Sequence, residues 1–91
     1  EFYVSPNYPN PFNPSTMIDI ETVEVSNLMV SVFDAKGRMV NNLVNSYLEA
    51  GRYSVKWNGT DASGMSMPTG VYFVRVQSGL KMHTQKMILI K

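Results

Sequence analysis

The sequence predicts an all-β fold, a two-sheet antiparallel sandwich of about seven strands, and three observations support this prediction. Apolar and polar residues alternate along several short runs, which is the period-two pattern of half-buried strands. Glycine, proline, asparagine and serine gather between these runs and indicate turns. No segment has a convincing helical pattern, so strands and turns account for the chain.

Size and composition indicate one folded domain. The chain has 91 residues, of which 44% are hydrophobic and 16% charged. This is enough for one core, too short for two domains, and unlike the composition of a disordered chain. We predict a Pro/Asn-rich linker and extended lead-in over residues 1–14 and a single sandwich domain over residues 15–91. The prolines exclude a helix in the lead-in, where Tyr8 and Phe12 are expected to pack against the domain edge.

The alternation locates the strands and their inward faces. The residues that share a face within each run are Ile18 and Ile20, then Leu28, Val30 and Val32, then Tyr53, Val55 and Trp57, then Tyr72, Val74 and Val76, and the faces of Trp57 and Tyr72 are expected to be the core faces. Residues 38–50 are ambiguous, because their apolar side chains approach helical spacing. The flanking turns and the adjacent Asn41 and Asn42 favour a bulged strand, and we predict a strand there.

Turn and core residues are expected to determine the fold. Hairpin turns are predicted at residues 34–37 and at Ser78–Gly79, and a longer loop at residues 58–64. The residues predicted to determine the fold are Gly37, Gly51, Tyr53, Trp57, Gly59, Asp61 and Gly64. The sandwich is Ig-like or fibronectin-like in architecture only, because the chain lacks the cysteine pair of antibody domains.

The sequence lacks the residue groupings of an enzyme, and we predict no catalytic residue, no cofactor and no metal site. The single histidine, His83, has neither an activated serine nor a second nitrogen or sulfur ligand in its pattern. The carboxylates are dispersed, and no glycine-rich phosphate loop occurs. Asp61 and its neighbours offer oxygen atoms to calcium, but they lack the dense carboxylates of a calcium loop. Bonding of Asp61 to backbone amides of its own turn is the favoured interpretation.

Charge and hydropathy exclude two further partner classes. The net charge is +1, and the basic residues are scattered rather than gathered on one face, so we expect no nucleic-acid binding. No apolar run approaches the roughly 20 residues of a membrane helix, so we expect no membrane insertion. The chain has no signal peptide and begins at Glu1, from which we expect a domain of a longer exported parent.

Five spaced motifs resemble a known family. In order they are YPNPFNPST, VFDAKGRMV, AGRYSVKWNGTDASG, TGVYFVRV and KMILIK, and they run from Tyr8 to Lys91. This succession resembles the type A C-terminal sorting domains of the type IX (Por) secretion system of Bacteroidetes. Those domains are related to the Ig-like domain of flagellar hook-capping proteins.

The resemblance implies a non-catalytic sorting domain that directs a larger protein through the type IX system. Its implied partners are the outer-membrane secretion machinery and an N-terminal passenger domain. It would pass through the periplasm and reach the cell surface or the medium. The implied recognition residues are Gly70, Val71, Tyr72, Lys86, Met87, Ile88, Leu89, Ile90 and Lys91. We expect the last six to form an unpaired terminal strand that can add to a partner's sheet edge.

Two other functions fit the sequence. The chain can be an Ig-like structural spacer or assembly module, as the hook-capping likeness implies. It can also be a carbohydrate-binding accessory module of a secreted hydrolase, although Tyr47 and Phe73 alone make a thin stacking platform, since Trp57 and Tyr72 are expected in the core.

Overall fold

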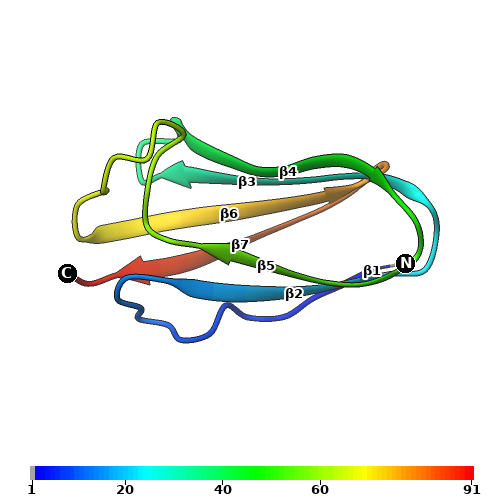
Figure 1. Cartoon of the computed structure of the whole chain (residues 1–91), viewed down its shortest axis with the longest axis horizontal. Helices are drawn as coiled ribbons and strands as arrows, with labels where there is room; N and C mark the ends of the chain where they lie inside the picture. Colours follow the sequence, from blue (N-terminus) through cyan, green and yellow to red (C-terminus); the bar gives the residue numbers. More distant parts are fainter. Residues whose placement is uncertain (1) are drawn as a thin grey trace.

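The chain folds into two facing antiparallel β-sheets, which confirms the predicted fold class (Figure 1). The computed structural model describes residues 2–91. Over that range the strands are β1 (Phe2–Val4), β2 (Thr16–Thr22), β3 (Ser26–Asp34), β4 (Met39–Leu48), β5 (Gly51–Trp57), β6 (Gly70–Ser78) and β7 (Lys81–Leu89). One sheet has the order β1-β2-β5 and the other the order β4-β3-β6-β7. Residues 2–91 include no helix with the length and apolar character needed to cross a membrane.

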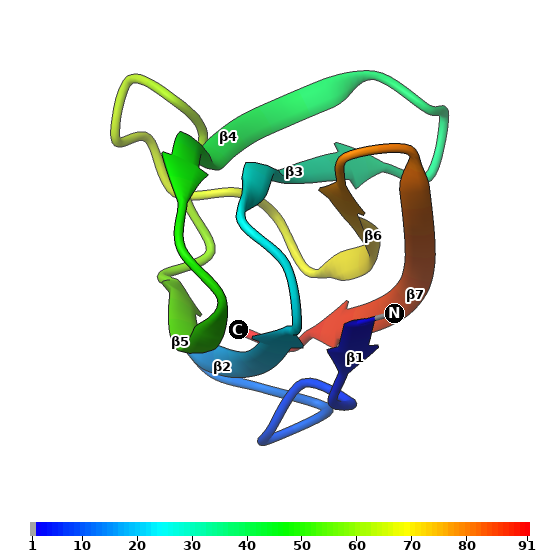
Figure 2. The same ribbon diagram turned by 90° about the vertical axis from the view of Figure 1, so that its right-hand side faces the viewer.

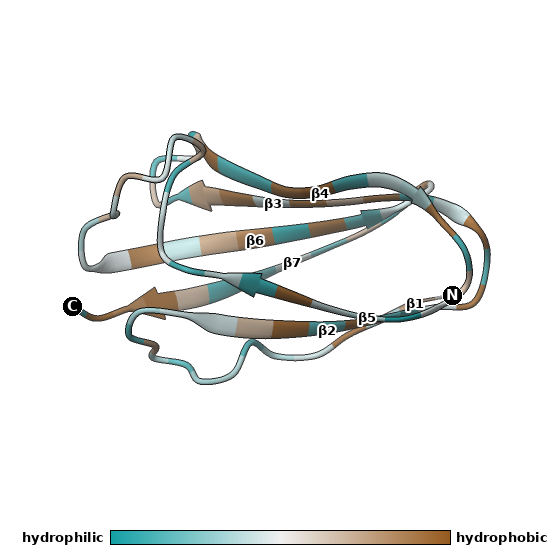
Figure 3. Ribbon diagram, in the orientation of Figure 1, coloured by the Kyte–Doolittle hydropathy of each residue, from teal (hydrophilic) through white to brown (hydrophobic). Residues whose placement is uncertain are grey.

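Strict alternation along the strands builds the core between the sheets. In β2, Ile18 and Ile20 are buried while Asp19 and Glu21 are exposed. The hydropathy bands along the ribbons in Figure 3 follow the same alternation. The buried apolar side chains are Phe12, Ile18, Ile20, Leu28, Val30, Val32, Val40, Val55, Trp57, Tyr72, Val74, Val76, Met87 and Leu89. Each sheet therefore buries one face, as the period-two pattern predicted.

The ambiguous segment is an irregular strand. β4 pairs with β3, and the register shifts between Val30 and Ser31 and again between Val32 and Phe33. These irregularities explain the near-helical spacing of its apolar residues, because each shift moves the following side chains to the other face. The β6–β7 turn is Gly79–Leu80, one residue later than predicted, because Ser78 already pairs with Lys81.

The lead-in is part of the sandwich. β1, within the segment predicted to be extended, pairs with β2 and lies near β7 at the open side of the two layers (Figure 2). Phe12 is 1% exposed and packs as predicted. The same prediction for Tyr8 is wrong, since its side chain is 80% exposed. Only the backbone of Tyr8 is held, through two hydrogen bonds with Met17, and this orients its ring toward solvent.

Three aromatic rings close one end of the core. The ring centroid of Trp57 lies 5.5 Å from that of Phe12 and 5.2 Å from that of Tyr72, in tilted and edge-on geometry. The indole Nε1 donates a hydrogen bond to the Thr60 carbonyl at 2.8 Å, and the Tyr72 hydroxyl donates to the Pro68 carbonyl at 2.6 Å. The cluster joins the lead-in, β5 and β6, so Trp57 has the anchoring position that the sequence predicted.

Gly59 lies where the loop after β5 passes closest to the lead-in. Its φ is +72°, and a Cβ atom there would meet the Pro14 carbonyl oxygen at 3.0 Å. Gly64, in the same loop, has φ +93° but open space around its Cα. Gly59 is thus required for both its backbone conformation and its contact, whereas Gly64 is required for conformation alone.

We expect Phe12→Ala to lower the free energy of unfolding by about 3–5 kcal/mol, because it removes a fully buried aromatic ring and leaves a cavity beside Trp57. Tyr8→Ala, its matched control in the same segment, should change that free energy by less than about 0.5 kcal/mol. Urea denaturation followed by tryptophan fluorescence measures both. Equal losses would contradict the docking of the lead-in through Phe12.

Gly59→Ala is expected to destabilise the domain by about 2–4 kcal/mol, the sum of a positive-φ penalty and a backbone clash with Pro14. Gly64→Ala carries the first penalty only and should cost about 1 kcal/mol. Differential scanning calorimetry of the two variants provides the comparison. If Gly64→Ala proves the more harmful, the lead-in does not approach the loop at Gly59.

Candidate functional site

The two segments implied in recognition lie side by side. Gly70, Val71 and Tyr72 pair in register with Leu89, Ile88 and Met87 at one end of the four-stranded sheet. The β6–β7 hairpin, whose turn the sequence predicts within one residue, brings these two segments together. The structure therefore brings these recognition candidates together on adjacent strands.

The paired segments divide between the core and the surface. Tyr72, Met87 and Leu89 are buried and act as core residues. Burial raises the pKa of the Tyr72 phenol, and the nearby charge of Asp34 raises it further. The residues available at the surface are Val71, Lys86, Ile88, Ile90 and Lys91, of which Ile88 is half-buried. Of the implied recognition side chains, only these surface ones are accessible to a partner that binds the folded domain.

The expectation of an unpaired terminal strand is wrong. Residues 86–89 pair with β6 along one edge, and the lead-in covers the other edge near the end of the strand. Phe12 donates its amide to the Ile88 carbonyl at 2.9 Å and accepts the Ile90 amide at 3.0 Å, while the Asn10 side chain accepts the Ile88 amide at 3.0 Å. Burial of the Phe12 ring draws this backbone alongside the strand. The backbone groups that strand addition requires are occupied here.

The final residue is also held. The Lys91 amide donates to the Thr69 hydroxyl at 3.0 Å, and its ammonium group donates to the Ser66 hydroxyl at 2.8 Å. Both partners belong to the segment that leads into β6. The end of the chain is therefore tied to the loop before Gly70.

Two of the predicted fold determinants, Asp61 and Gly37, lie in turns in which a carboxylate accepts hydrogen bonds from backbone amides. Asp61 accepts hydrogen bonds from the amide and hydroxyl of Ser63 at 3.0 and 2.8 Å and from the Met65 amide at 2.9 Å. The bond from the Ser63 hydroxyl, with the amides, lowers the pKa of the Asp61 carboxyl. In the hairpin that contains Gly37, Asp34 accepts the amides of Lys36 and Arg38, and the Arg38 amide is the largest cause of its lowered pKa. Asp61 thus makes the turn that the sequence predicted.

Gly51 and Tyr53 lie at the start of β5. Gly51 has φ +157° and follows the turn from β4. Tyr53 is half-buried and packs against the core, and its hydroxyl donates a hydrogen bond to the Glu49 carbonyl in that turn. The tyrosine therefore connects the turn to the core.

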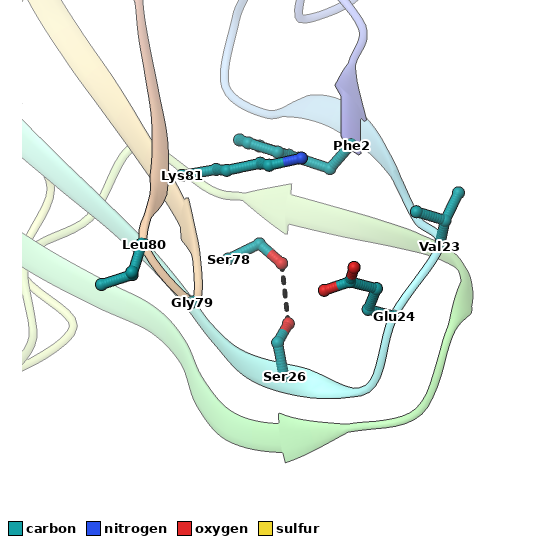
Figure 4. Close-up of a pocket in the computed structure, with 8 residues that line it drawn as sticks. All are labelled: Phe2, Val23, Glu24, Ser26, Ser78, Gly79, Leu80 and Lys81. Atoms are coloured by element: carbon teal, nitrogen blue, oxygen red, sulfur yellow. Dashed lines mark hydrogen bonds between the residues drawn. The ribbon is translucent and has the colours of Figure 1, made fainter.

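A hollow of about 250 Å³ opens at the end of the domain opposite the cluster of Phe12, Trp57 and Tyr72 (Figure 4). Its polar groups are the Glu24 carboxylate, the Lys81 side chain and the hydroxyls of Ser26 and Ser78, which lie 2.7 Å apart in a hydrogen bond. Leu80 points out from its rim into solvent. These groups come from the β2–β3 connection and the β6–β7 turn and form no nucleophile–base–carboxylate arrangement within the described residues.

The histidine and the carboxylates lie apart. His83 is exposed on β7, and its Nε2 is 2.9 Å from the Gln85 side-chain oxygen. Across the part of the chain that the structure describes, no three histidine or acidic side chains gather in a way that could hold a metal ion.

Sequence reasoning missed a set of side chains on the outer face of the four-stranded sheet. The guanidinium of Arg75 lies 4.5 Å from the ring centroid of Phe33, and both line a shallow hollow of about 280 Å³ together with Phe73 and Thr84. Alternation along the sequence places Phe33 on the face opposite Val30 and Val32, and Arg75 on the face opposite Val74 and Val76. Their contact was hidden because it depends on the pairing of β3 with β6, which the sequence does not specify.

Comparison with protein families gives one match, which covers most of the chain. The model for the FlgD Ig-like domain matches residues 11–81. No curated protein sequence matches the chain.

Solved structures provide similar folds. PorU of Porphyromonas gingivalis, described as dimeric and latent, superposes over 99% of this chain with a TM-score of 0.72 and 26% identity. PorZ of the same bacterium, described as an essential surface component of the type IX secretion system, superposes over 99% with a TM-score of 0.62 and 26% identity. FlgD of P. aeruginosa matches 82% of the chain at 33% identity with a TM-score of 0.62.

The matched region is a small part of PorU and of PorZ, and somewhat more than half of the FlgD chain. The chain corresponds to 9% of PorU, 11% of PorZ and 60% of the FlgD chain. The similarity therefore concerns one module within larger molecules.

We expect acid to weaken the domain through Asp34 and Asp61. Both carboxyls have a lower pKa in the folded chain than the ordinary value of 3.8. They stabilise the folded state above that value, and this contribution is lost as the pH falls through their folded-state pKa. The thermal midpoint should fall on acidification below about pH 4, and the fall should be smaller in the double variant Asp34→Asn, Asp61→Asn. A parallel fall in both proteins would assign the acid effect to other carboxyls.

Proposed function

The chain belongs to the family of FlgD Ig-like domains, and from this premise we propose that it is a non-catalytic sorting domain through which a type IX secretion system exports a larger protein. The observation that carries the proposal is the likeness of nearly the whole chain to a domain of PorZ, a surface component of that system. The motif succession from Tyr8 to Lys91, which resembles the type A sorting domains, supports the same assignment.

The proposed partners follow from this role. The domain would be carried behind a passenger in the same polypeptide and engaged by the outer-membrane machinery. It would cross the periplasm and reach the cell surface or the medium. The surface residues of the paired strands, from Val71 and from Lys86 to Lys91, are the proposed contacts, since Tyr72, Met87 and Leu89 are buried in the core.

A partner could also bind the terminal strand by adding it to its own sheet. This would require the lead-in to be released from that strand. The hydrogen bonds of Phe12 and Asn10 to Ile88 and Ile90 would first have to break. Recognition of the intact folded surface requires no such opening. We therefore propose recognition of the folded domain.

A structural module is the second candidate. FlgD of P. aeruginosa is 33% identical to this chain, compared with 26% for PorU and for PorZ. The matching family model is that of the FlgD Ig-like domain. In this alternative the domain spaces or assembles larger parts and carries no export information.

An export assay separates the two candidates. A fluorescent protein with a periplasmic signal peptide is fused ahead of residues 1–91 and expressed in a bacterium with a type IX system and in the same strain without it. We expect fluorescence at the surface or in the medium of the first strain only, because export requires the machinery to bind this domain. Fractionation and immunoblotting measure the distribution.

The matched control is the same passenger without the domain, which should stay in the periplasm of both strains. Retention of the fused passenger in the periplasm of the strain with the system would refute the sorting function and favour the structural module.

A further inference from the structure

The two outer faces of the sandwich differ in how their charges are satisfied. On the three-stranded sheet, Asp19 accepts a hydrogen bond from Ser54 at 2.7 Å, and Glu21 lies 3.7 Å from Arg52 in an ion pair. Each of these carboxylates therefore has a cross-strand partner. The charges of this face sum to zero, because Arg52 and Lys56 match the two carboxylates, and the exposed Tyr3 and Met17 lie on the same face.

The outer face of the four-stranded sheet is mixed apolar and cationic. One cross-strand row reads Met39, Phe33, Phe73 and Lys86, and the next reads Asn42, Ser31, Arg75 and Thr84. Ser31 is 1% exposed although it points outward, because its longer neighbours close over it. The long side chains thus form a continuous surface in the middle of the sheet.

The cations on this face lack acidic partners. Over residues 2–91 the ion pairs are Arg38 with Asp34 and Arg52 with Glu21, so neither Arg75 nor Lys86 takes part in one. Asp34 lines the rim of the hollow beside Phe33, but its carboxylate is bonded to Arg38 and to backbone amides. Two positive charges therefore remain available beside apolar side chains.

Arg75 is oriented before any partner arrives. Its guanidinium lies over the Phe33 ring, 4.5 Å from the ring centroid, and this contact reduces the freedom that the side chain loses on binding. The adjoining hollow of about 280 Å³ has walls from Phe33 and Phe73. An apolar side chain fits there, with a carboxylate within reach of Arg75 or Lys86.

We propose that this cationic face, defined by Phe33, Val71, Phe73, Arg75, Lys86 and Ile88, is the docking surface for an acidic protein segment that inserts an apolar side chain between its carboxylates. The charge complementarity selects the occupant, since within residues 2–91 the face presents two unpaired cations and no unpaired carboxylate. The inference rests on the proposed sorting function, in which this segment belongs to the secretion machinery.

Charge reversal on the two faces tests the proposal. The export fusion is prepared with Arg75→Glu and Lys86→Glu on the cationic face, and with the matched pair Arg52→Glu and Lys56→Glu on the opposite face, which makes the same change in net charge. We expect the first pair to reduce export about tenfold or more, because like charges then meet across the contact, and the second pair to leave export near that of the unchanged domain.

Two further variants guard against misfolding. Lys86→Glu alone alters an exposed side chain and should still reduce export, while Arg75→Lys keeps the charge and should retain more export than Arg75→Glu. Thermal midpoints of the purified domains identify any variant that fails to fold. Equal export by the two double variants overturns the docking surface.

The outcomes separate the two proposals. If the unchanged domain exports no passenger, the sorting function fails, and this inference falls with it. If the unchanged domain exports but the cationic face can be reversed without effect, only the inference fails. Binding of the isolated domain to phosphatidylglycerol vesicles, lost on reversal of the cationic face, would assign the face to a lipid surface and overturn the protein partner.

Discussion

The packing of Trp57 between Phe12 and Tyr72 is the contact on which the rest of the structure depends. The indole belongs to the three-stranded sheet, Tyr72 to the four-stranded sheet and Phe12 to the lead-in, so a single cluster fixes three separate parts of the chain. A domain of this size buries a modest share of its surface and has few core residues to spare. Large aromatic rings supply much of that burial, and their polar atoms are satisfied by backbone carbonyls at the rim.

The same alternation that fills the core also decides what the outside offers. Every second residue of the regular strands points outward, and the two sheets use these positions differently. β2 and β5 place Asp19 opposite Ser54 and Glu21 opposite Arg52, whereas β3, β6 and β7 place aromatic, aliphatic and cationic side chains there. A surface that balances its own charges gains little from a partner. The other face leaves charge and apolar area for an interaction.

The alternation of apolar and polar residues was sufficient to predict the strands, but it did not predict which segments pair along the strand edges. The buried faces around Ile18, Val30 and Val74 follow from period two, and the irregularity of β4 follows from its conflicting signals. Composition does not distinguish Phe12 from Tyr8, since both are aromatic residues among prolines, and only the folded chain shows which ring finds space beside Trp57. The cover over the terminal strand and the contact of Arg75 with Phe33 depend on pairings between distant residues, which a single sequence does not encode locally.

The bond between Phe12 and the strand that ends at Leu89 joins the first part of the chain to the last. During synthesis, the backbone amide and carbonyl of Phe12 have no native partner until the closing strand brings Ile88 and Ile90. A polypeptide truncated before that strand would lack both core residues and the backbone groups that receive Phe12. Such long-range closure makes folding slow and late. The native form of the module therefore requires the lead-in and the terminal strand together.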